Sequence, residues 1–122
     1  MHLRLQANHY DTFFAIDGVS AVAEARKHMP DLILLDLGLP GGDGFNVMEW
    51  LAGNPYLVVI PIIVVSARTG HENRMRARKF GAKAFLEKPV ENDELLAVIR
   101  QALGEAAVAK VKKAVVHDLG NL

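Results

Sequence analysis

The chain has no cysteine, and its 14 basic and 14 acidic side chains leave a formal charge of zero over 122 residues. Without cysteine there are no disulfides, thiolate metal sites or cysteine nucleophiles, which fits a reducing cytoplasm. A balanced charge gives no global reason to expect nucleic acid or a membrane surface as the partner. We therefore expect chemistry that uses neither thiols nor a strong overall charge.

Long hydrophobic runs are also missing. The longest, residues 57–65, is too short to cross a bilayer and contains Pro61. No signal peptide is visible at the N-terminus. The five histidines, at positions 2, 9, 28, 71 and 117, show no metal-ligand spacing, so no zinc site is expected. We expect a soluble, cytoplasmic chain of a size that fits one domain.

One apolar stretch ends in a carboxylate. Residues 32–35 are leucine and isoleucine without polar alternation, which is typical of a strand buried on both faces of a parallel sheet. Asp36 follows at the carboxyl end of that strand, and a loop rich in proline and glycine comes next. Ligands of open α/β sheets bind outside the carboxyl ends of strands. Asp36 is therefore the leading candidate for a chemical role.

The rest of the pattern alternates strands with helices, which predicts an α/β fold with a parallel sheet covered on both faces. Asn92 is expected to cap the last helix, and the basic residues 74–79 to form a solvated helix face or part of a partner surface. The expected strands are 12–16, 33–36, 62–65 and 84–87, and the expected helices are 19–28, 45–51, 72–80 and one that starts at 92.

Three motifs carry a family resemblance. The segment 36–44 (DLGLPGGDG), Ser66-Ala67 after an apolar run, and Lys88-Pro89 at the end of residues 81–89 lie on successive expected strands. In this order and spacing they resemble the receiver domains of two-component response regulators, from about Leu3 to about Leu103. The resemblance implies a flavodoxin-like doubly wound sheet of order 2-1-3-4-5 and a signalling module that is not an enzyme.

The resemblance also implies roles for single residues. Asp36 would accept a phosphoryl group from a sensor histidine kinase or phosphotransfer protein, and Lys88 would pair with Asp36 and then with that group. Ser66 would bind a phosphoryl oxygen, although a strand-end serine bonded to backbone is the alternative. Phe85 would be the aromatic switch or plain core. Pro89 would follow a cis peptide bond.

Magnesium is the implied cofactor. Its ligands would be Asp36, the backbone carbonyl of Gly38 and, in place of the acidic pair of the family, Asp118. His117 stands where the other acid belongs, so we expect weak binding. Asp43 is expected to shape the loop or cap the following helix.

Both ends of the sequence depart from the family pattern. The expected first strand and its acidic pair are missing from their usual place, and an unfilled interior slot would leave two rows of unpaired backbone groups, each costing about 1–3 kcal/mol. We divide the chain into a receiver domain, 1–104, and a C-terminal segment, 105–122. Lys113 to Asp118 (KAVVHD) resembles the missing strand, placed in its own molecule or exchanged within a strand-swapped homodimer.

Other interpretations stay open. The segment could be helical, with Val108, Val111 and Val115 on one face. Residues 117–122 (HDLGNL) would then resemble the H-box of a hybrid histidine kinase in which His117 passes phosphate to Asp36. A frayed tail is the third possibility for this segment. A receiver-like interaction module that no longer switches is another alternative. A haloacid dehalogenase-type phosphatase needs Asp-x-Asp, and position 38 is glycine.

Overall fold

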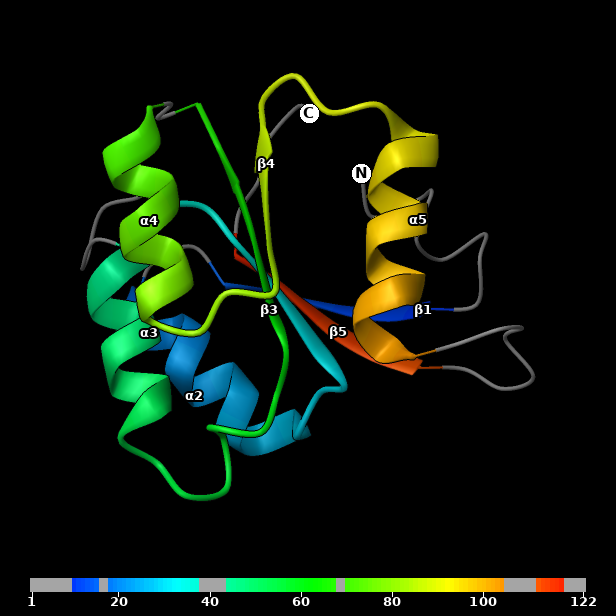
Figure 1. The fold of residues 1–122 in the computed structure, drawn as a ribbon. Helices are drawn as coiled ribbons and strands as arrows, with labels where there is room; N and C mark the ends of the chain where they lie inside the picture. The colour runs from blue at the N-terminus through cyan, green and yellow to red at the C-terminus, as the bar shows by residue number, and fades with distance from the viewer. Residues whose placement is uncertain (1–9, 16–17, 38–43, 68–69, 105–111, 118–122) are drawn as a thin grey trace.

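The computed structural model describes residues 10–15, 18–37, 44–67, 70–104 and 112–117 (Figure 1). Strands and helices alternate along this part of the chain. In order, they are β1 (Tyr10–Ala15), α2 (Gly18–His28), β2 (Leu32–Leu35), α3 (Gly44–Ala52), β3 (Ile62–Ser66), α4 (His71–Lys79), β4 (Ala84–Glu87), α5 (Asn92–Leu103) and β5 (Lys112–His117).

The described strands form one parallel sheet in the order β1-β5-β2-β3-β4. Strand β5 therefore lies between two strands from much earlier in the chain, with Val115 opposite Phe13 on one side and Ile33 on the other. Figure 1 shows β1 and β5 side by side. It is the position that we expected for the C-terminal segment, up to His117; Asp118 lies outside the described residues.

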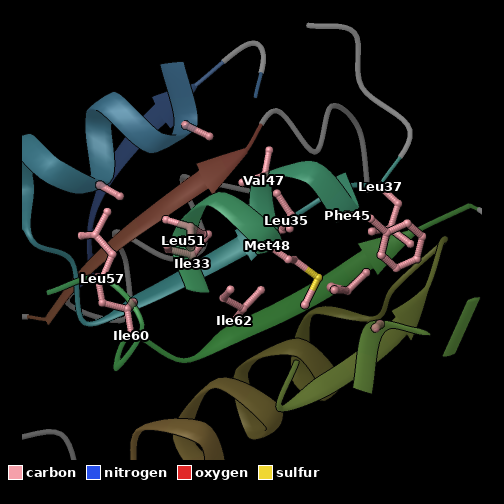
Figure 2. Packing of buried hydrophobic residues seen from close by; sticks show 14 residues of the cluster. Ile33, Leu35, Leu37, Phe45, Val47, Met48, Leu51, Leu57, Ile60 and Ile62 are labelled. Atoms are coloured by element: carbon pink, nitrogen blue, oxygen red, sulfur yellow. The ribbon is translucent and has the colours of Figure 1, made fainter. Parts of the chain in front are cut away.

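Two layers of side chains cover the two faces of the sheet. Ile33 and Leu35 face a cluster formed with α2 and α3, shown in Figure 2, whereas Leu32 and Leu34 face a cluster formed with α5. All four residues of β2 are buried, which explains why its sequence lacks polar alternation. Because every pairing is parallel, the carboxyl ends of the strands meet at one edge of the sheet.

Helix α3 confirms the helix expected over 45–51, and its Phe45, Met48 and Leu51 are buried. Among the described helices, none is long and apolar enough to cross a bilayer. Gly81 lies just past the end of α4: its φ of 97° is one that glycine adopts readily, and its N–H donates to the carbonyl of Arg78.

One helix cap was predicted wrongly. Asn92 is the first helical residue of α5, and the N-cap is Glu91, whose side chain makes no capping hydrogen bond. Asp93 and Glu94 do lie in the first turn, where a carboxylate interacts favourably with the helix dipole. The helix therefore begins with charge rather than with a side-chain cap.

Candidate functional site

An ion pair links the ends of two strands. Asp36 directly follows β2 and is 7% exposed, while Lys88 directly follows β4. The Lys88 Nζ lies 2.7 Å from Asp36 Oδ2, and the two side chains are 22% and 10% exposed. Water screens such a pair less than one on the open surface, so the ammonium is a strong local source of positive charge.

Backbone contacts hold the main chain of Lys88 in place. Strand β3 lies between β2 and β4, and its last residue, Ser66, is opposite Glu87. The Ser66 carbonyl accepts a hydrogen bond of 3.0 Å from the Lys88 N–H, and Ser66 is 1% exposed. The Lys88-Pro89 peptide bond is cis, as the family resemblance implied. The three residues predicted from separate motifs thus end three neighbouring strands.

Gly44 closes the loop that follows Asp36, a role that the sequence reasoning missed. Its N–H donates to the Leu37 carbonyl at 3.2 Å. A β-carbon at this position would lie 2.6 Å from Leu37 Cα and 2.9 Å from the Asp36 carbonyl oxygen, closer than real contacts allow. The Asp-Gly pair at 43–44 was a turn signal, but nothing in the sequence showed which backbone the glycine would meet.

The surroundings of Phe85 were also unforeseen. The ring is half-buried and packs against the cluster under α3, and the Arg74 guanidinium lies 4.9 Å from its centroid. Arg76 lies 4.1 Å from the Phe45 ring in the same way. Both arginines are exposed, as expected for a solvated face, and their guanidinium groups also lie on the two rings, because long side chains can lay apolar and planar parts on neighbouring surface while remaining partly in water.

The structure describes part of the expected magnesium site. Asp36 is the one expected ligand whose side chain the structure describes; Gly38 and Asp118 lie outside the described residues. No group of three or more histidine, cysteine, aspartate or glutamate residues able to hold a metal occurs within the described ranges. A buried carboxylate at a strand end fits the oxygen chemistry of Mg²⁺, but one carboxylate with a lysine on it is a weak site by itself.

Helices on both faces of a parallel sheet, with a carboxylate and an ammonium at its carboxyl edge, define a class: doubly wound α/β proteins with a strand-end site. Within that class, the family model described as response regulator receiver domain matches residues 1–100, and the chain belongs to this family. It is thus a receiver domain of two-component signalling.

Several known proteins are similar to the chain. The response regulator PleD of Caulobacter vibrioides is 37% identical over 100 residues, which are 82% of this chain but 22% of PleD. The polar-differentiation response regulator DivK of Brucella anthropi is 35% identical over 102 residues, 84% of this chain and 83% of DivK. The chain thus spans about a fifth of PleD and most of DivK.

A solved structure supports the same family. The receiver domain of the sensor histidine kinase PA1611 from Pseudomonas aeruginosa, which has a magnesium ion in its active site cleft, superimposes with a TM-score of 0.77. The two chains are 26% identical, and 85% of each is covered.

Proposed function

We propose that this receiver accepts a phosphoryl group on Asp36 from a sensor histidine kinase or a phosphotransfer protein and changes its choice of protein partner in response. The observation that carries the proposal is the contact of 2.7 Å between Lys88 Nζ and the largely buried Asp36 carboxylate, at the carboxyl edge of a parallel sheet. A receiver domain generally implies a histidine kinase partner, and neither nucleic acid nor a membrane is proposed for this chain.

The chemistry needs little more than placement and charge. An Asp36 carboxylate oxygen attacks the phosphorus of a phosphohistidine, an O–P bond forms and the P–N bond breaks. The imidazole nitrogen keeps the electron pair of that bond, and the ring takes up a proton from water. The charge that spreads over the phosphoryl oxygens is stabilised by nearby cations. Lys88 already lies at the accepting carboxylate, and Ser66 ends the adjacent strand, where its hydroxyl can donate to a phosphoryl oxygen.

Magnesium would supply further positive charge at the phosphoryl oxygens. We propose that Asp36, the Gly38 carbonyl and Asp118 hold it, and that binding is weak. In this chain His117 precedes Asp118 at the place where the family has an acidic pair, and cation affinity in oxygen sites rises with the number of charged ligands.

We also propose that residues 105–122 complete the domain that residues 1–104 begin. Support comes from the parallel pairing of β5 with both β1 and β2, which gives hydrogen-bond partners to two strands that would otherwise have open edges. The same pairing favours a strand over the helical H-box alternative. A β5 strand exchanged between two copies of the chain would make equivalent pairings with β1 and β2, so the same pairing is compatible with a strand-swapped homodimer.

The test is phosphorylation in vitro. The wild-type protein, incubated with acetyl phosphate and Mg²⁺, should gain one phosphoryl group by intact mass, and beryllofluoride should shift NMR signals around Ser66 and Phe85. Asp36→Asn should gain nothing, because an amide is a poor nucleophile and cannot form the acyl phosphate. If Asp36→Asn is still labelled, another residue is the phosphoryl acceptor.

A non-switching interaction module is the second candidate, favoured by the histidine at position 117 where the family has one acid of its pair. It predicts that neither reagent changes the wild-type protein at any Mg²⁺ concentration. The same experiment therefore separates the two candidates.

A further inference from the structure

Helix α4 has little apolar anchorage of its own. Its sequence, HENRMRARK, places one buried residue, Ala77, against the rest of the molecule. Amphipathic helices usually dock through a broad apolar stripe. Contacts other than hydrophobic burial must therefore contribute much of what holds α4 in place.

Two arginines supply those contacts. Arg74 and Arg76 are two residues apart, so their side chains leave the helix about 200° apart around its axis. Arg74 reaches β4, and Arg76 reaches α3, where its guanidinium lies 4.1 Å from the Phe45 ring centroid. The helix is thus tied on one side to β4 and on the other to the start of the helix that follows the acceptor loop.

The Arg74 contacts all fall on one face of β4. Its Nη2 lies 2.6 Å from Glu87 Oε1, its Nη1 donates to the Phe85 carbonyl at 3.4 Å, and its guanidinium lies 4.9 Å from the Phe85 ring centroid. Phe85 and Glu87 are two residues apart in a strand and so point to the same side of the sheet. Leu86 points to the other side, into the cluster under α5.

From this geometry we infer that Arg74 is a positioning residue: it holds Phe85 in the conformation in which Lys88 pairs with the Asp36 carboxylate, and it thereby limits how readily Asp36 is modified. This inference rests on the proposed function. If modification draws the Phe85 ring toward Ser66, the ring must leave the guanidinium, and the lost contact opposes the change. By thermodynamic linkage, a residue that favours the unmodified conformation must lower the affinity for a phosphoryl analogue.

The size of the effect follows from the exposure of the contacts. Arg74 and Glu87 side chains are each 44% exposed, so their ion pair is partly screened by water. Contacts of this kind change an equilibrium constant by a small factor. Together, the ion pair with Glu87 and the contact with the Phe85 ring should lower the affinity for a phosphoryl analogue roughly three- to tenfold. Most of this decrease in affinity should be lost when Arg74 is replaced.

The experiment compares single variants by beryllofluoride titration in Mg²⁺, followed by NMR. Arg74→Ala should bind beryllofluoride roughly three- to tenfold more tightly than wild type, and Glu87→Gln about twofold more tightly, because the guanidinium keeps the ring but loses its anchor. Arg78→Ala is the matched control: it is an exposed arginine of the same helix whose side chain forms no hydrogen bond or ion pair within the described residues. It should match wild type.

Arg74→Lys guards against a mere loss of helix stability. It keeps the charge and the helix propensity of position 74 but not the planar fork, so its affinity for beryllofluoride should lie between those of wild type and Arg74→Ala. Equal affinities in wild type, Arg74→Ala and Arg78→Ala would overturn the inference, and so would weaker binding in Arg74→Ala alone.

A second readout separates this inference from the proposed function. In the protein without beryllofluoride, Arg74→Ala should shift and broaden the Phe85 ring signals, and Arg78→Ala should not. If wild type responds to neither beryllofluoride nor acetyl phosphate, the proposed function fails, and the limit on modification fails with it. Unchanged ring signals in Arg74→Ala would refute the contact itself while leaving phosphorylation of Asp36 intact.

Discussion

Replacing Gly44 by alanine adds one methyl group where the backbone leaves no room. The new β-carbon would lie 2.6 Å from Leu37 Cα, 2.8 Å from Leu37 Cδ2 and 2.9 Å from the Asp36 carbonyl oxygen. Two of these three atoms belong to the backbone, so a change of side-chain rotamer cannot relieve the contact. Either the start of α3 or the segment Asp36–Leu37 must shift.

The expected cost can be bounded. Extra methyl groups forced into a packed interior destabilise by about 1–3 kcal/mol. The higher helix propensity of alanine offsets part of this destabilisation. Relative to glycine it amounts to about 1 kcal/mol in a helix interior and to less at a first residue. The rigid neighbours favour the upper part of the range, so we expect a net loss of about 2 kcal/mol, or roughly 6–10 °C in melting temperature for a domain of this size.

Gly53→Ala is the matched control. Its β-carbon would make ordinary contacts, at 3.5 Å and 3.7 Å from two carbonyl oxygens at the end of α3. Urea unfolding of both variants should show a large loss for Gly44→Ala and a change within about 0.5 kcal/mol for Gly53→Ala. Acetyl phosphate labelling should also slow in Gly44→Ala, because the residue presses on the acceptor segment. Equal stability of the two variants would refute the close-approach argument.

Lys88→Ala should remain folded but lose about 1–3 kcal/mol in urea unfolding, because it leaves the largely buried Asp36 carboxylate without its cation. Labelling of Asp36 should persist in that variant while the NMR response at Phe85 disappears; an unchanged response would remove the role given to the lysine. Mg²⁺ titration of the wild-type protein should give a dissociation constant well above the micromolar range, and sub-micromolar binding would contradict the sparse ligand set. Deletion of residues 111–122 should unfold or aggregate the protein, whereas a cooperatively folded, soluble 1–110 fragment would show that β5 is dispensable.

Much of the fold could be predicted from local pattern. Residues 32–35 and 62–65 lack polar alternation because both faces of their strands are covered, and periodicity reports that directly. The end of α2 was also predictable, since Pro30 cannot continue a helix. Met29 lies just beyond the helix, with a φ of 45° and 48% of its surface exposed.

The candidate site, too, was predicted from the sequence only in part. Asp36 was predicted because it directly follows an apolar strand, whereas Ser66 and Lys88 were predicted from motifs that resemble those of receiver domains. Parallel strands bring all three positions to one edge. Gly44 and Arg74 were missed, because their roles depend on which backbone or ring lies opposite in three dimensions. A basic run such as 74–79 has the same appearance in sequence whether its arginines extend into water or lie on phenylalanine rings.

Strand β5 also constrains the order in which the sheet can form. Among the described strands, β1 pairs with β5 alone, and its Tyr10 is opposite Lys112, about a hundred positions later in the chain. Strands β2, β3 and β4 can associate through nearer contacts, but β1 and β2 cannot be bridged until β5 has been synthesised. A growing chain would therefore leave β1 and one edge of β2 unpaired, and open to pairing with other chains, until β5 emerges from the ribosome.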